Sequence, residues 1–219
     1  MRSSGFVVAF LLSTSWLYGA DAKFPAATGV LSQKEIDEGF VSLFDGKTLD
    51  GWQGATENYV VEDGRLVCKR GHAKRLYTAK QYADFQFRFE FKQEPGTQGN
   101  NGVAIRAPSG GRNLEIQVFN NHHPRAKRLK PYQLHGSIYG LVPAKTGHLK
   151  PAGQWNSQEI MCQGRRVKVT LNGAVIVDAD LDKTGGAHHK PGPRTKGHIG
   201  FLGHSNRIEF RNLRIKELQ

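Results

Sequence analysis

A carboxylate and an amide stand two residues apart within one alternating run of the sequence. Glu115 and Gln117 alternate with Leu114, Ile116 and Val118. A strand here would direct the apolar residues to a core and the polar pair to the opposite face. A carboxylate beside an amide suits the recognition of hydroxyl groups, and the carboxylate can also serve as a general acid or base. The alternative is that both side chains simply face solvent, as polar residues on an exposed sheet face do.

A guanidinium and an imidazole are the other candidate chemical groups. Arg106 alternates with Gly102 and Ala104, whose small side chains leave room for a ligand on that face. Its guanidinium would bind a carboxylate or stabilise an oxyanion, or else pair with Glu115 as a structural partner. His204 follows a late strand, where an imidazole is either a proton-transfer group or an exposed loop residue.

Two pairs of adjacent histidines have the wrong spacing for a strong metal site. They are His122-His123 and His188-His189. Neighbouring side chains of an extended chain point to opposite faces, so they do not readily bind one ion. We expect them to be loop residues or weak metal contacts.

The elements that would position these groups are short strands. Phe85, Phe87, Phe89 and Phe91 alternate with polar residues, and Asn172-Gly173 separates two alternating runs. The first pattern is typical of a half-buried strand, and the second is a strong hairpin signal. Further strands are expected over 199–202 and 208–215, and no sustained helical periodicity is present. These patterns predict an all-β, single-domain β-sandwich or jelly roll.

The N-terminal residues have the pattern of a secretory signal peptide. Arg2 precedes an apolar run that is too short to span a membrane, and Ala20-Asp21-Ala22 offers a cleavage site. We therefore expect residues 1–22 to be a signal peptide, 23–38 a linker with a short helix capped by Ser32 and Glu35, and 39–219 the folded domain. The mature protein would be exported, to the periplasm or the medium, with no transmembrane segment.

Only two cysteines are present, Cys68 and Cys162, and both fall in strand-like runs. An oxidising compartment would permit a disulfide between them. Two buried thiols are the equally weighted alternative.

Positive charge is concentrated in two connections. The chain has 31 Lys and Arg residues against 19 Asp and Glu, a net charge of +12. No acidic residue occurs between Ile116 and Gln158, and a second basic stretch runs from Lys183 to His198. Acidic glycans match this charge, whereas an exported β-sandwich argues against nucleic acid as the partner.

An ordered set of short motifs resembles the 3-keto-disaccharide hydrolase family, long described as a domain of unknown function. The similarity extends from about Gly39 to Leu218. The motifs are Gly39–Trp52, Val61–Leu66, Tyr82–Phe85, Asn101–Pro108, Leu114–Val118, Gly136–Gly140, Pro151–Asn156, Gly197–Phe201 and Ile208–Ile215. The resemblance implies a concanavalin-like, glucanase-like jelly roll that cleaves glycosides whose sugar carries a ketone at C3.

The resemblance also implies roles for individual residues. A C3 ketone acidifies the C2 proton, so a base can remove it and the C1 substituent can leave by elimination before water adds. Glu115 or His204 would be the base, and Arg106 would stabilise the enolate. If the family uses a divalent metal, Glu115 and His204 are the candidate ligands. The expected substrate-binding residues are Gln117, Asn101, Tyr139 and Trp155.

The chain departs from the family pattern at Asn120-Asn121, where an acidic pair is common. This departure leaves a second hypothesis open, a non-catalytic carbohydrate-binding module on the same fold. The two hypotheses differ in one geometric expectation: in an enzyme, Glu115, Arg106 and His204 should meet in one groove.

Overall fold

The computed structural model describes residues 31–71, 73–108, 114–184 and 195–219. The expected signal peptide, together with His188 and His189, lies outside these residues. The helical elements are α1 (Gln33–Asp37) and three 3-10 helices, η1 (Thr56–Asn58), η2 (Pro124–Arg128) and η3 (Pro131–Gln133). Among the described residues, no helix is long and apolar enough to cross a membrane.

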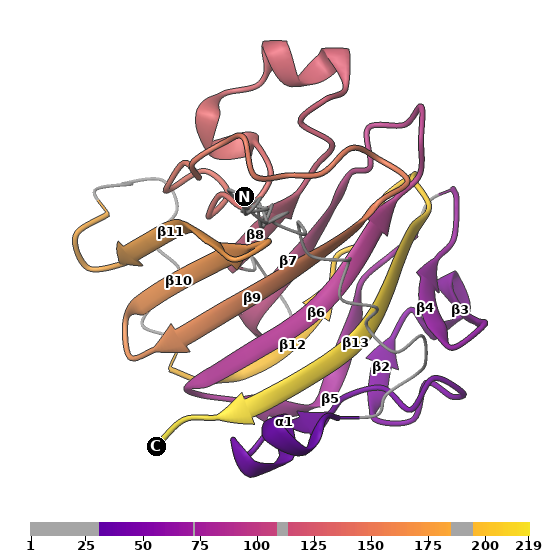
Figure 1. The fold of residues 1–219 in the computed structure, drawn as a ribbon, viewed down its shortest axis with the longest axis vertical. Coiled ribbons are helices and arrows are strands. Elements are labelled where there is room, and N and C mark those ends of the chain that lie inside the picture. Colours follow the sequence, from indigo (N-terminus) through magenta and orange to yellow (C-terminus); the bar gives the residue numbers. More distant parts are fainter. Residues whose placement is uncertain (1–30, 72, 109–113, 185–194) are drawn as a thin grey trace, which may run out of the picture.

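Two antiparallel sheets make up the fold (Figure 1). The first has eight strands in the order β11-β10-β9-β6-β13-β4-β3, with β1 also paired to β13. Its strands are β1 (Val41–Ser42), β3 (Tyr59–Glu62), β4 (Arg65–Cys68), β6 (Phe85–Gln93), β9 (Trp155–Gln163), β10 (Arg166–Leu171), β11 (Ala174–Asp180) and β13 (Ile208–Glu217). The second has five strands in the order β2-β5-β12-β7-β8. Its strands are β2 (Trp52–Gly54), β5 (Leu76–Tyr82), β7 (Asn101–Ala107), β8 (Leu114–Val118) and β12 (Gly197–Phe201). The expected jelly-roll β-sandwich is confirmed.

The core lies between the two sheets and is rich in phenylalanine. The four alternating phenylalanines of β6 are all buried, as the sequence pattern predicts. Phe201 of the five-stranded sheet stacks on Phe210 of the eight-stranded sheet with ring centroids 3.9 Å apart. Such stacked pairs add to the free energy gained by burying apolar area, so they fix how the sheets pack.

Two local predictions are confirmed. Ser32 accepts a hydrogen bond from the backbone N–H of Glu35 while the Glu35 carboxylate accepts one from the backbone of Ser32, which is the expected capping box. Asn172 and Gly173 both have positive φ between β10 and β11. That conformation matches the right-handed twist of the strands in a tight hairpin.

The two cysteines are buried free thiols. Strand pairing places Cys68 level with Gln93 and Cys162 level with Phe85 on β6. Eight residues of strand span about 26 Å, whereas a disulfide needs Cα atoms within about 7 Å. The disulfide alternative is therefore excluded within the chain.

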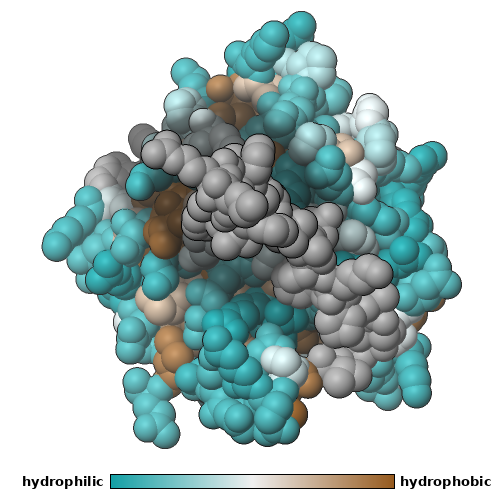
Figure 2. Space-filling view, viewed as in Figure 1, coloured by the Kyte–Doolittle hydropathy of each residue, from teal (hydrophilic) through white to brown (hydrophobic). Residues whose placement is uncertain are grey.

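The connection between β8 and β9 is the long segment at the top of Figure 1. It carries η2 and η3 and packs against β8, since the N–H of Tyr139 donates to the carbonyl oxygen of Glu115 (2.9 Å). In Figure 2, which views the molecule from the same side, the described surface is mostly hydrophilic.

Candidate functional site

One row of aligned residues crosses all five strands of the smaller sheet. The register pairs Gln53 with Tyr77, Tyr77 with Gly200, Gly200 with Ala104, and Ala104 with Glu115. Directly paired residues of antiparallel strands share a face. The row belongs to the outer face of the sheet, since none of its members is in the core cluster. Its centre is a floor of two small residues, with an aromatic ring on one side and a carboxylate on the other.

The carboxylate of Glu115 lies over Gly102. Leu114, Ile116 and Val118 are buried in the core, as predicted, which directs Glu115 to the outer face. A Cβ atom on Gly102 would approach Glu115 Oε1 to 2.3 Å. Real Cβ atoms do not come that close to an oxygen, so the position of the carboxylate depends on a glycine at this point of β7.

Burial raises the pKa of Glu115 to about 7, and the positive charge of Arg75 opposes this rise. A carboxyl group loses hydration when it is buried, and its charged form is then disfavoured. A carboxylate with a pKa near neutrality is a strong enough base to remove an acidic carbon-bound proton and still be ionised at pH 7 to 8.

Tyr77 and His198 form the other side of the site. A Cβ on Gly200 would lie 2.4 Å from Tyr77 Cδ1, so the tyrosine ring covers this glycine. The rings of Tyr77 and His198 have centroids 6.3 Å apart. His198 Nδ1 donates to the carbonyl oxygen of Thr78 (2.8 Å), and its Nε2 accepts from the Gln81 amide (3.1 Å). These contacts hold the imidazole ring in place.

Sequence reasoning missed both Tyr77 and His198, although a signal for His198 was present. In residues 197–201, Ile199 and Phe201 are core residues. Their alternation with His198 and Gly200 indicates that the imidazole lies on the outer face.

Three of the expected residues meet at β8. Gln117 shares the face of Glu115, and its Nε2 donates to the carbonyl oxygen of Gln133 (3.3 Å). The Gln133 side-chain amide donates to the Tyr139 hydroxyl (2.9 Å). Gln117 and Tyr139 are thus linked through Gln133, and the backbone N–H of Tyr139 donates to the carbonyl oxygen of Glu115 (2.9 Å).

Arg106 is placed away from this group, so the expectation that Glu115, Arg106 and His204 all meet in one groove is wrong. One β12 residue, Ile199, faces two β7 residues at a β-bulge, and Arg106 has φ 45°. The bulge breaks the alternation with Ala104 and turns the side chain aside. Its guanidinium donates to the carbonyl oxygens of Ala83 (2.7 Å) and Gly164 (2.6 Å) and to Asp84 Oδ1 (2.6 Å). The alternative of a pair with Glu115 is also wrong, because the carboxylate partner is Asp84.

His204 and Asn101 lie beyond the row of aligned residues. His204 is exposed and follows the end of β12, two residues after Leu202, whose N–H donates to the carbonyl oxygen of Gly102 (2.9 Å). Asn101 is fully buried, and its Oδ1 accepts from the backbone N–H groups of Gly102 (2.8 Å) and Gly203 (3.2 Å). The geometry makes Asn101 a support for the turn that carries His204, and the expected direct contact with substrate does not fit its burial.

Trp155 lies on the other sheet. It belongs to β9 and pairs with Lys92. The Arg211 guanidinium lies 4.0 Å, and Lys92 Nζ 5.0 Å, from the ring centroid. Its neighbours Asn156 and Gln158 are buried. Trp155 therefore points outward from the eight-stranded sheet, away from Glu115.

The described residues do not fit a metal centre. No group of three His, Cys, Asp or Glu side chains that could hold an ion occurs in this part of the chain. His122 donates to the carbonyl oxygen of Leu149, and His123 Nδ1 accepts from the N–H of Arg125. Of the expected ligand pair, Glu115 lies on β8 and His204 follows the end of β12, with β7 between these two strands.

The residues that replace the family's acidic pair serve the backbone. Asn120 donates to the carbonyl oxygen of Thr97 (3.0 Å) and accepts from the N–H of His122 (3.1 Å). Asn121 accepts from the N–H of His135 (2.9 Å). These contacts hold the start of the β8–β9 connection in place.

A jelly roll with a desolvated carboxylate on the outer face of its smaller sheet is an architecture suited to acid–base chemistry on a sugar. Residues 39–216 match the family described as the 3-keto-alpha-glucoside-1,2-lyase-like domain, and the chain therefore belongs to this family of glycoside-cleaving enzymes. The predicted family resemblance is confirmed.

Several known proteins are similar to the chain. It is 25% identical to the 3-keto-disaccharide hydrolase of Bacteroides thetaiotaomicron, over 83% of this chain and 79% of that protein. A crystal structure of a proposed glycosyl hydrolase from Parabacteroides distasonis is 26% identical with a TM-score of 0.77, over 88% of this chain and 100% of the other. The carbohydrate-binding module CBM66 of Bacillus subtilis shares the fold at 13% identity and a TM-score of 0.54, over 76% of this chain and 96% of the module.

Proposed function

We propose that this protein is an exported hydrolase that cleaves the glycosidic bond of 3-keto-glycosides, with Glu115 as the base. The observation that carries the proposal is the placement of Glu115: its carboxylate lies over Gly102, in one row with the small residues Ala104 and Gly200, and burial raises its pKa to about 7. Family membership and the similarity to a 3-keto-disaccharide hydrolase support the choice of substrate.

The reaction would begin with removal of the C2 proton by the Glu115 carboxylate. The electron pair of the C2–H bond moves toward the C3 carbonyl and forms an enolate. The enolate then collapses and expels the C1 substituent, which takes a proton from solvent and leaves as an alcohol. Water adds to C1 of the resulting enone and releases a proton to solvent, and C2 regains the proton held by Glu115. The sum is hydrolysis of the glycosidic bond, and the base is regenerated.

The other residues have roles that follow from their position. The Tyr77 ring covers Gly200 and offers an aromatic face on which a sugar ring would lie, in the same row as Glu115. Arg75 replaces Arg106 as the proposed electrostatic partner of the enolate, because its charge already acts on Glu115. Gln117 and the Tyr139 hydroxyl would bind sugar hydroxyl groups.

Export is proposed from the N-terminal sequence. The basic residue, apolar run and small-residue cleavage site fit a signal peptide that is removed near Ala22. Mass measurement of the protein recovered from outside the cytoplasm would show a mature chain that begins close to Asp21–Lys23. Recovery of the intact chain would contradict this proposal.

Turnover of a 3-keto-disaccharide, with and without chelator, tests the proposed reaction. We expect hydrolysis by the native protein and a loss of at least two orders of magnitude in kcat for Glu115→Gln, as is usual when a general base is removed. Glu57→Gln is the matched control, since Glu57 is exposed and outside the site. Unchanged turnover by Glu115→Gln would remove Glu115 from the mechanism. Binding without turnover by the native protein would instead support the carbohydrate-binding module.

A further inference from the structure

The connection between β8 and β9 is strongly cationic. We call residues 119–154 the basic segment, because it contains no Asp or Glu. Its six Lys and Arg side chains are all exposed. They are Arg125, Lys127, Arg128, Lys130, Lys145 and Lys150. The upper part of Figure 2, where this segment projects, is mainly hydrophilic.

The cations of the basic segment differ from those in the rest of the described chain. Elsewhere most arginines pair with a carboxylate within 4 Å. These are Arg65, Arg70, Arg88, Arg106, Arg165, Arg166, Arg207, Arg211 and Arg214. Within the described residues, none of the six cations of the basic segment forms an ion pair with a carboxylate. Carboxylates in the described part of the chain therefore leave this charge unpaired.

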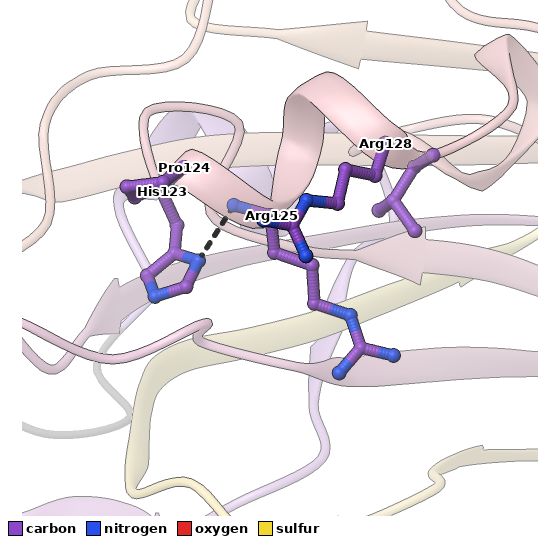
Figure 3. A pocket seen from close by; sticks show the side chains of 5 residues that line it. His123, Pro124, Arg125 and Arg128 are labelled. Atoms are coloured by element: carbon purple, nitrogen blue, oxygen red, sulfur yellow. Dashed lines mark hydrogen bonds between the residues drawn. The ribbon is translucent and has the colours of Figure 1, made fainter.

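Part of this charge surrounds a hollow of about 500 Å³. The hollow is lined by His123, Pro124, Arg125, Arg128 and Leu129. Figure 3 shows the His123, Arg125 and Arg128 side chains on the same side of η2. The imidazole of His123 is fixed because its Nδ1 accepts from the N–H of Arg125 (3.1 Å). The hollow thus combines two guanidinium groups with the apolar surfaces of a proline and a leucine.

The arginines retain donors for a ligand. Arg125 Nη1 donates to Gln98 Oε1 (3.2 Å), which is a neutral partner that orients the guanidinium without cancelling its charge. A guanidinium presents its donors in a planar fork that matches a carboxylate or a sulfate. An apolar surface beside such a fork is suited to the ring that carries the anionic group.

The basic segment also adjoins the proposed catalytic site. Gln133, which follows the hollow in η3, accepts a hydrogen bond from Gln117, and Tyr139 donates its backbone N–H to the carbonyl of Glu115. A glycan chain bound at Glu115 and extending past β8 would therefore meet the basic segment.

We propose that the hollow of the basic segment binds the carboxylate or sulfate group of an acidic glycan. The choice of a carbohydrate over other polyanions rests on the proposed function. The binding test does not depend on catalysis, because it uses native sugars without a 3-keto group. A failure of this proposal therefore leaves the proposed hydrolysis untouched, and a failure of the hydrolysis test is seen in turnover and not in this binding measurement.

Binding is measured by calorimetry at 0.15 M NaCl with three probes: an oligogalacturonate, a sulfated oligosaccharide and a neutral glucan oligosaccharide of equal length. We expect saturable binding of an acidic probe, no binding of the neutral probe, and at least tenfold weaker binding by Arg125→Gln/Arg128→Gln. Lys145→Gln/Lys150→Gln removes the same charge away from the hollow and should keep affinity within threefold. The two acidic probes distinguish a carboxylate from a sulfate.

Three results would overturn the proposal. They are no binding of either acidic probe, equal losses in the two double variants, and tighter binding of a DNA duplex of matched charge. No binding would mean that the hollow is not a site for acidic glycans. Equal losses would mean that the whole cationic surface attracts the probe, and tighter binding of DNA would mean that nucleic acid is the ligand. If the arginine variant does not fold, the native protein can still be tested with phenylglyoxal, which modifies arginine side chains. Modification should abolish binding of the acidic probe, and modification carried out with the acidic probe present should leave binding intact.

Discussion

Replacement of Glu115 by glutamine should make the protein more stable above neutral pH. Burial raises the pKa of this carboxyl from 4.5 to about 7, so the folded protein holds the proton more tightly than the unfolded chain. Below pH 4.5 the carboxyl is protonated in both the folded and the unfolded state, so its ionisation does not change the free energy of unfolding. Between pH 4.5 and about 7 the unfolded chain has released this proton while the folded protein keeps it, so stability falls across this range and levels off above it. The difference between the two pKa values corresponds to about 3 kcal/mol at pH 8.

The glutamine variant avoids this cost because an amide is neutral at every pH. Its free energy of unfolding should exceed that of the native protein by about 3 kcal/mol at pH 8 and match it at pH 4. For a chain of this length, the gain corresponds to a rise in Tm of about 6–12 °C at pH 8. The same variant should be inactive, so stability and activity should change in opposite directions.

Denaturant unfolding of both proteins at pH 4, 6 and 8 is the assay, with Glu57→Gln as the control that removes an exposed carboxylate. The control should show no comparable gain. A Glu115→Gln effect that is the same at pH 4 and pH 8 would refute the reasoning. It would mean that Glu115 titrates as an ordinary carboxyl group and is not tuned as a base.

Three further changes test the site and its support. In Gly102→Ala, the new Cβ would come within 2.3 Å of Glu115 Oε1, so the carboxylate should move toward solvent. The acid limb of the pH profile of kcat/KM should then shift to lower pH, and activity should fall at least tenfold. Arg106→Gln removes a buried guanidinium that donates to three partly exposed acceptors and should lower the free energy of unfolding by about 1–3 kcal/mol. The acid limb of the pH profile, measured on the folded fraction, should stay in place. Burial lowers the pKa of His135 to about 4, so the unfolded chain alone takes up a proton between pH 6.5 and 4. The native protein should lose about 3 kcal/mol in that window, and denaturant melts of His135→Gln should show a smaller loss.

Local patterns predicted the strands, because each depends on one segment of the chain. The alternating phenylalanines of β6, the apolar residues of β8 and the hairpin at Asn172-Gly173 follow from side-chain period and turn chemistry alone. Whether Cys68 and Cys162 could form a disulfide depended instead on the order of the strands in the sheet. Cys68 and Cys162 are equally good strand residues, and only the pairing through β6 places them at opposite ends of the sheet.

The site was predictable where the alternation is regular and not where it breaks. Glu115 and Gln117 lie on a regular strand, and their shared face was predicted correctly. Arg106 falls in a bulge with left-handed backbone, which a period of two does not reveal in a non-glycine residue. Trp155 was grouped with Glu115 by sequence similarity, yet the two residues belong to different sheets. Such separation depends on long-range pairing, which no local pattern contains.

The absence of carboxylates from residues 119–154 makes the attraction of this surface for a polyanion sensitive to salt. Its lysine and arginine side chains are exposed, and dissolved ions screen exposed charges within about 10 Å at 0.1 M ionic strength. The ionisation of Glu115, by contrast, responds to pH. A change in ionic strength would therefore alter how long the protein stays on a charged polymer, whereas a change in pH would alter how fast it works there.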